Sequence, residues 1–315
     1  MNMGRLQQLA AQQLSSAHLK RCVLILFRTV FLLGLTYIIC FPLFARLCST
    51  FMSPMDVLDS TVIYIPKNPT LDNLRFVVLE NDFISAFIHT LLLAVLYGVL
   101  QPFFTCMIGY GLASYQVPFK KLIIALVVLT FVIPPQTLQI SMYSGFRYID
   151  PFSLFSTVFG EPMNWIDTPL PMAMLSVTGL AFKNGIYILL FYQFFKGVPV
   201  ELREAGEIDG AGMLRIYFNL ILPTAVPMLV TVCMLSFSWQ WTDTQYTGLF
   251  FSDLSLLSNQ VLQLGSNTDM VYGGPEYVSV LINTGVLLAI LPLLILFLFA
   301  QRLIMQGIES SGIVG

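Results

Sequence analysis

Six long apolar runs follow one another along the chain, each bounded by charged residues, proline or glycine. The hydrocarbon core of a bilayer is about 30 Å thick, so one spanning helix needs roughly 20 predominantly apolar residues. The runs that reach this length are residues 22–48, 83–113, 122–143, 170–195, 222–241 and 277–300. The pattern predicts an all-α, polytopic membrane protein with six transmembrane helices.

The segments between the runs give the rest of the organisation. A polar, glutamine-rich segment, 1–21, precedes the first run, and an external segment, 49–82, follows it. The second to sixth runs form one core, 83–300, which a polar loop at 196–222 interrupts, and the chain ends in a tail, 301–315. The first run is too long for the core of a secretory signal, so we expect it to remain as a membrane helix.

Lysine and arginine are distributed unevenly among the connecting segments. Lys67, Arg75 and Arg147 lie on one side of the predicted membrane, and three further cations fall within the runs. The cations on the other side are Arg5, Lys20, Arg21, Lys120, Lys121, Lys196, Arg203, Arg215 and Arg302. Because cytoplasmic loops carry the excess of positive charge, both termini are expected in the cytoplasm.

The amino-acid composition also favours a membrane protein over a soluble one. The chain is 57% hydrophobic and 10% charged, whereas a soluble domain has about 25% charged residues. A net charge of −2 gives no reason to expect nucleic-acid binding, and the five cysteines are scattered without metal-ligand spacing. Prolines within or beside the runs favour bent helices around a cavity: Pro42, Pro102, Pro134, Pro135 and Pro292.

The loop at 196–222 has its own local structure. Pro199 suits a first helical turn, Glu201 and Glu204 suit the positive end of a helix dipole, and Gly210 suits a left-handed stop. A short helix from Pro199 to about Asp209 is therefore expected, followed by a second one over 213–220. Its acidic face is unsuited to an anionic membrane surface, which leaves docking into a groove on a cytoplasmic partner or a purely structural loop.

The residues of this loop resemble a known motif. The run from Glu204 to Ala211, with Leu222-Pro223 after it, is similar to the EAA loop of ABC-importer permeases, and the residues before it resemble the carbohydrate-uptake permeases of the maltose type, particularly the smaller subunit. The resemblance implies a type I ABC importer permease fold. It implies contact with the ATPase by Glu204, Ala205, Gly206, Asp209, Gly210 and Ala211, with Pro223 at the hinge of the moving segment.

The resemblance runs from about Ile65 to the end of the chain. The tail is similar to the family's C-terminus, which reaches between the two ATPase subunits; the residues implied in that contact are Gln301, Arg302, Gly312 and Gly315. One departure is Gly206, where the family usually has a second alanine.

The resemblance also implies partners and a location. It predicts a second, different permease subunit, two ABC ATPase subunits and an extracytoplasmic solute-binding protein, in the inner or plasma membrane of a prokaryote. ATP and Mg²⁺ would be bound by the ATPase partner, because this chain lacks a GxxxxGK[ST] phosphate loop. The chain is expected to hold no cofactor or metal and not to be an enzyme.

Carbohydrate as the cargo follows from the resemblance alone. The candidates for the substrate path combine aromatic faces, an amide and a cation: Trp239, Gln240, Trp241 and Lys183. An aromatic belt at the membrane interface would explain the two tryptophans equally well. Lys183 could instead snorkel to the interface or pair with a neighbouring helix. The alternative function is a secondary transporter or channel, which needs charged residues deep in several spans, and only Lys183 is a candidate. A membrane-embedded enzyme needs a cluster of histidines and carboxylates, which the sequence does not show.

Overall fold

The computed structural model describes residues 3–80, 82–267 and 275–310. Its regular elements are helices, and the only other pairing in these residues is an isolated bridge between Ile149 and Met163. Two compact units divide the chain: Met1–Leu74 with Thr268–Leu287, and Arg75–Asn267 with Leu288–Gly315. The expected all-α class is confirmed.

The first unit contains α1 (Met3–Thr50), α2 (Pro54–Leu58), most of α3 (Asp72–Arg75) and the first part of α16 (Pro275–Ser310). Its centre is the buried Asn73, whose Nδ2 donates to the carbonyl oxygens of Thr50 and Met52, both at 2.8 Å, and whose Oδ1 accepts from the hydroxyl of Tyr277. These bonds fix the end of α1 to the segment that follows it.

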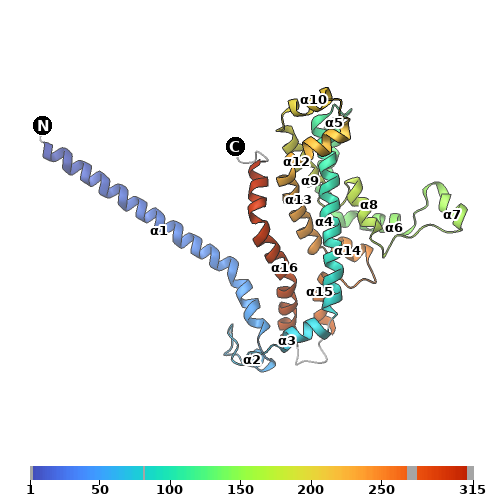
Figure 1. Cartoon of the computed structure of the whole chain (residues 1–315). Coiled ribbons are helices and arrows are strands. Elements are labelled where there is room, and N and C mark those ends of the chain that lie inside the picture. The colour runs from blue at the N-terminus through green and yellow to red at the C-terminus, as the bar shows by residue number, and fades with distance from the viewer. Residues whose placement is uncertain (1–2, 81, 268–274, 311–315) are drawn as a thin grey trace. The chain divides into compact units, whose positions relative to one another are not determined.

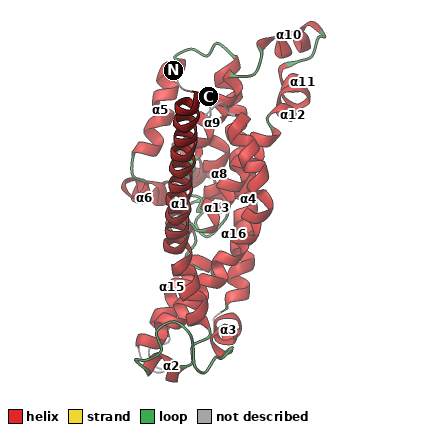
Figure 2. Ribbon diagram, turned by 90° about the vertical axis from the view of Figure 1, so that its left-hand side faces the viewer, coloured by secondary structure: helices red, strands yellow, loops and turns green. Residues whose placement is uncertain are grey.

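The second unit is a bundle around α4 (Phe83–Ser114), which packs against α8 (Leu170–Thr178), α9 (Asn184–Lys196) and α13 (Val226–Trp241), as Figures 1 and 2 show. Glycines make the closest approaches possible. A Cβ at Gly109 would lie 2.5 Å from Phe191 Cβ on α9, and one at Gly98 would lie 3.3 Å from Phe237 on α13. Small residues at helix crossings are the usual means of close packing between membrane helices.

Two of the predicted spans are bent, as their prolines indicate. The third consists of α5 (Lys120–Val132), η2 (Pro135–Leu138) and α6 (Gln139–Arg147), with a bend of 96°. In the fifth, α11 (Met213–Ile216), η4 (Tyr217–Ile221) and α12 (Leu222–Thr224) form one arm, Met213–Thr224, which meets α13 at a bend of 80°. Shorter elements complete this unit: η1 (Phe76–Glu80), η3 (Pro151–Ser153), α7 (Leu154–Phe159), α10 (Val200–Ile208), α14 (Gln245–Phe250) and α15 (Leu257–Asn267).

The fourth predicted span is not one continuous helix. α8 ends at Thr178 and α9 begins at Asn184, with Gly179 at φ +77° and Lys183 at φ +72° between them. The side chain of Asn184 donates from Nδ2 to the carbonyl of Ser176 at 3.2 Å, so it satisfies backbone left free at the end of α8.

Within the described residues, three helical stretches are long and apolar enough to cross a membrane: Lys20–Thr50, Phe83–Ser114 and Glu276–Arg302. Counting each bent pair as one span raises this number to five. A protein with several spans is therefore confirmed, while the count of six and the cytoplasmic position of both termini remain predictions.

Candidate functional site

The 196–222 segment folds as the sequence predicts. α10 extends over Val200–Ile208, and Gly210 follows it at φ +73°. The N–H of Ala211 donates to the carbonyl of Gly206, and the N–H of Gly210 donates to the carbonyl of Glu207, both at 3.0 Å. This pair of bonds is the Schellman motif, in which a left-handed residue, commonly glycine, ends the helix.

Gly206 lies on the inner side of α10. A Cβ there would lie 2.9 Å from Leu220 Cδ1 and 3.0 Å from Ile216 Cγ1, so the bare backbone of α10 rests on α11 and η4. Ala211 is half-buried against the same core cluster, to which Ile216 and Tyr217 belong. Of the six residues expected to contact an ATPase, Gly206 thus packs inward and Ala211 partly so.

The other four residues of that set are exposed, as is the hinge residue: Glu204, Ala205, Asp209, Gly210 and Pro223. Pro223 lies in the first turn of α12, just before the break at Ala225 where the 80° bend occurs. The structure thus places a change of direction directly beside the predicted hinge.

This segment also carries an exposed apolar group that was not expected from the sequence. The side chains of Ile208, Met213, Leu214 and Phe218 are exposed. Ile208 is the extreme case, with 86% of its surface accessible at the end of an otherwise acidic helix. Exposed apolar groups with a polar rim are typical of protein contacts, and the break in the acidic pattern at Ile208 is the signal that could have revealed this one.

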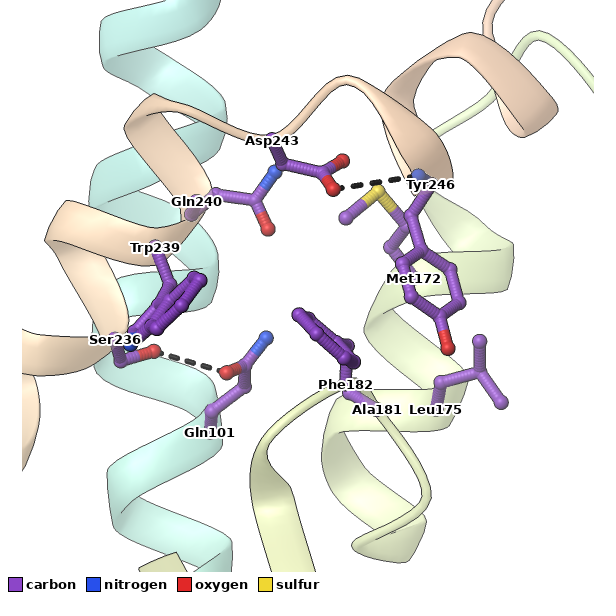
Figure 3. Close-up of a pocket in the computed structure, with 10 residues that line it drawn as sticks. All are labelled: Gln101, Met172, Leu175, Ala181, Phe182, Ser236, Trp239, Gln240, Asp243 and Tyr246. Carbon is purple, nitrogen blue, oxygen red and sulfur yellow. Dashed lines mark hydrogen bonds between the residues drawn. The ribbon is translucent and has the colours of Figure 1, made fainter. Parts of the chain in front are cut away.

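A small polar cavity lies between α4, α13 and the break before α9 (Figure 3). Ser236 Oγ donates to Gln101 Oε1 at 2.9 Å, and the amide groups of Gln101 and Gln240 face the space between them. The Nε2 of Gln240 is buried without a hydrogen-bond partner among the described residues. The cavity of about 20 Å³ has room for about one water molecule, so the pocket is too narrow for a sugar in this structure.

Two of the candidate substrate-path residues border this pocket, and a third stands next to it. Trp239 and Gln240 line it, and the Lys183 ammonium lies 4.2 Å from the ring centres of both Phe182 and Trp239. A cation between two aromatic faces is stabilised by their quadrupoles. Lys183 is therefore held at the α8–α9 break by two aromatic rings, one of which, Trp239, belongs to α13.

Trp241 lies elsewhere. It is buried, its Nε1 donates to the carbonyl of Ala289 at 2.9 Å, and its ring packs edge-on against Phe87 at 5.5 Å between centroids. This tryptophan joins α13 to neighbouring helices and does not line the polar pocket.

Other members of the pocket were not found from the sequence: Gln101, Phe182, Ser236 and Tyr246. A glutamine within an apolar run, at Gln101, was the one available signal. Asp243 also borders the pocket, but its carboxylate accepts from the backbone N–H groups of Gln245, Tyr246 and Thr247 and so serves the start of α14.

The predicted ATPase-contacting tail is described only in part. Gln301 and Arg302 are exposed near the end of α16, and Gln301 Nε2 donates to the carbonyl of Leu298 at 3.0 Å. Gly312 and Gly315 lie outside the described residues. Among the described residues, no group of three or more His, Cys, Asp or Glu side chains is placed to hold a metal ion.

Comparison with known proteins identifies relatives over most of the chain. The family model "Binding-protein-dependent transport system inner membrane component" matches residues 105–310. The melibiose/raffinose/stachyose import permease protein MelC of Bacillus subtilis is 26% identical over 235 residues, which cover 73% of this chain and 76% of MelC. The arabinooligosaccharides transport system permease protein AraQ of the same organism is 24% identical over 296 residues, which cover 91% and 95% of the two chains.

The fold also has a counterpart among solved structures. A chain in the crystal structure of a bacterial ABC transporter involved in the import of the acidic polysaccharide alginate superposes with a TM-score of 0.67 at 15% identity. The match covers 90% of this chain and 97% of that one. The fold described above is thus similar to that of a chain in a solved transporter structure.

Proposed function

Because the chain belongs to the family of binding-protein-dependent transport system inner membrane components, we propose that it forms half of the membrane pathway of a carbohydrate importer and couples that pathway to an ATPase through residues 196–222. As a member, it is a non-catalytic, multi-pass permease subunit of a bacterial ABC transporter in the inner membrane. A carbohydrate cargo is supported by relatives whose names specify sugars, MelC and AraQ among them.

The observation that carries the coupling proposal is the construction of the 196–222 segment. The outer face of α10 is exposed and carries acidic and apolar side chains. Its inner face packs against the bundle core at Gly206. A segment of this kind can transmit force, because it is fixed to the bundle on one side and open to a partner on the other. Coupling also requires that the partner contact differ in strength between two states, which nucleotide-driven closure of two ATPase subunits holding ATP and Mg²⁺ would supply.

In this mechanism the bend beside Pro223 is where the motion of the 196–222 segment reaches α13. Trp239, Gln240 and the neighbouring Lys183 would then border the path of the sugar, which opens when the narrow pocket widens. The second permease subunit would provide the other half of the path, and an extracytoplasmic binding protein would deliver the sugar.

The test of this function is uptake by the reconstituted complex. Proteoliposomes containing the chain with its co-expressed permease, ATPase and binding protein are offered radiolabelled raffinose, trehalose or arabinotriose, with ATP or a non-hydrolysable analogue inside. We expect uptake of at least one sugar only with hydrolysable ATP and the binding protein. Uptake by the chain alone without ATP would replace this proposal with the secondary-transporter alternative.

Ile208→Asp is expected to weaken the ATPase contact. Burying an isoleucine side chain is worth about 1.5–3 kcal/mol, so its replacement by a charge should lower the recovery of ATPase with the purified complex by about tenfold or more. Quantitative immunoblotting of the purified complexes measures this ratio. Ile208→Leu is the control and should retain recovery; equal recovery with the aspartate variant would show that Ile208 lies outside the contact.

A further inference from the structure

Arg203 fastens α10 to the end of α4. Its Nη1 donates to the carbonyl of Ser114, the last residue of α4, at 2.7 Å, across 89 positions of sequence. The guanidinium also lies 5.4 Å from the ring centre of Tyr115, and its Nε is 3.6 Å from Glu207 Oε1 on α10 itself. The Arg203 side chain is only 21% exposed, so it belongs to the interior of the 196–222 segment.

This contact is well suited to holding a helix end. The last four carbonyl groups of an α-helix lack partners within it, and the same end carries the negative pole of the helix dipole. A guanidinium can donate to a carbonyl from one edge while its plane lies against an aromatic ring and another nitrogen faces a carboxylate. The ammonium group of a lysine can donate to the carbonyl, but it cannot also stack flat on the ring and face the carboxylate with a second nitrogen.

The joined end of α4 is embedded in an aromatic cluster. Tyr115 packs edge-on against Tyr110, and Tyr110 contacts Phe195 of α9 and Tyr217 of η4, each at 5.3 Å between ring centroids. Beside this cluster lies a cavity of about 210 Å³ that Arg203 also lines. Ser114 and Arg203 both line this cavity, so the Arg203 side chain bridges a space that the packing of α4 and α10 leaves open.

Near its middle this same helix supplies a wall of the polar pocket. Gln101 and Ser114 both lie on α4, about 20 Å apart along the axis at ~1.5 Å per residue. Pro102, directly after Gln101, lies inside the helix and removes one of its backbone donors. A proline at this point provides a site where α4 can bend between the pocket and Arg203.

We propose that Arg203 is a positioning residue that makes α4 a second output of the coupling segment, in addition to α13. When α10 moves with the ATPase, Arg203 draws the end of α4 with it. α4 then bends in the turn 98–102, whose backbone hydrogen bond Pro102 removes, and this turn reorients the Gln101 side chain in the pocket. This inference rests on the proposed coupling function and adds to it a second route, through Ser114 and Tyr115, that leaves Pro223 uninvolved.

The experiment uses the complete co-purified complex in nanodiscs, with the five native cysteines replaced by serine and Gln101→Cys introduced as a reporter. Its rate of labelling by a maleimide is measured without nucleotide and with ATP and vanadate. Four backgrounds are compared: wild-type Arg203, Arg203→Ala, Arg203→Lys, and Lys196→Ala. The last is the matched control, because it removes an exposed cation that lines the same cavity but lies over Tyr192 of its own helix at 5.6 Å.

We expect nucleotide to change the labelling rate with wild-type Arg203 and with Lys196→Ala, and Arg203→Ala to reduce that change by at least about tenfold while ATPase recovery stays the same. Arg203→Lys should retain part of the response. An undiminished response in Arg203→Ala would overturn the proposal, and so would loss of the ATPase from both Arg203 variants, which would make Arg203 a docking residue. Absence of the ATPase from the wild-type complex would instead refute the proposed function itself, and this inference with it.

Discussion

Gly109→Ala should destabilise the folded chain, whereas Gly111→Ala, on the same helix, should not. The added Cβ at Gly109 would lie 2.5 Å from Phe191 Cβ and 3.0–3.1 Å from backbone atoms of Tyr192 and Ile188, which cannot give way independently of α9. At Gly111 a Cβ meets nothing within 4 Å. Overpacking costs about 1–3 kcal/mol. Because backbone atoms cannot move aside as side-chain atoms can, we expect the loss of stability in Gly109→Ala to lie near the upper end of this range.

Alanine improves helix propensity by up to about 1 kcal/mol over glycine at either position, so the two variants differ only in the α4–α9 contact. Thermal unfolding in detergent, followed by size-exclusion chromatography of the heated samples, compares them directly. Gly109→Ala should lose its monodisperse peak several degrees below wild type and Gly111→Ala at or above it. Equal midpoints for the two variants would mean that α4 and α9 do not approach as described.

Gly206→Leu should detach α10 from the bundle, whereas Gly206→Ala should be tolerated. The three atoms nearest to the alanine Cβ all belong to side chains: Leu220 Cδ1 at 2.9 Å, and Ile216 Cγ1 and Cδ1 at 3.0 and 3.4 Å. Side-chain atoms can shift by a few tenths of an ångström. The higher helix propensity of alanine offsets that shift. A leucine adds three further carbons to this buried position, and overpacking of this kind costs about 1–3 kcal/mol. The fraction of chains in which α10 packs against the bundle should therefore fall by roughly ten- to hundredfold.

Limited trypsin digestion measures whether α10 is packed against the bundle, and it needs no partner subunit. Cleavage after Arg203, whose side chain is 21% exposed when α10 is seated, should be strongly accelerated in Gly206→Leu and near the wild-type rate in Gly206→Ala. ATPase recovery should fall in parallel for the leucine variant. Unchanged cleavage and unchanged recovery in Gly206→Leu would contradict the packing of α10 on η4.

Local chemistry made α10 predictable from the sequence. Pro199 and the left-handed Gly210 bound a helix whose observed limits, Val200–Ile208, lie within a residue of the expected ones. Each of these residues acts through its own φ angle or the few neighbouring backbone groups, so the information is contained in a short window. The bend in the third predicted span was equally accessible, because Pro134 and Pro135 stand at the break itself.

The break in the fourth predicted span could not be predicted from a short window of sequence. Residues 179–182 are glycine, leucine, alanine and phenylalanine, a composition that hydropathy cannot distinguish from a continuous helix. The break is stabilised by Gly179 in the left-handed region and by the side chain of Asn184 on the carbonyl of Ser176. A non-glycine residue at positive φ, as at Lys183, is not readable from sequence because it depends on tertiary contacts.

The same limit applies to the pocket and to Arg203. Gln101 and Ser236 are 135 positions apart, and Arg203 and Ser114 are 89 apart. Composition suggested Trp239 and Gln240, which line the pocket, and also Trp241, whose Nε1 donates to the carbonyl of Ala289 instead. Neighbouring residues on a helix face different sides, and which side faces a pocket is decided by packing that one sequence does not reveal.

Co-purification tests the central claim most directly. The tagged chain is expressed in its native host, mildly solubilised and isolated as wild type, Gly210→Asp and Gly160→Asp. Both glycines have positive φ, at +73° and +85°, with nothing within 4 Å of an added Cβ, and aspartate tolerates this conformation better than most residues. The two variants therefore impose similar backbone strain and add the same charge, but only Gly210 lies on the 196–222 segment.

We predict that a second permease and an ATPase accompany the wild-type chain and Gly160→Asp, and that the ATPase is missing from Gly210→Asp. A chain that purifies alone in all three forms, and still transports solute without ATP, would contradict the account.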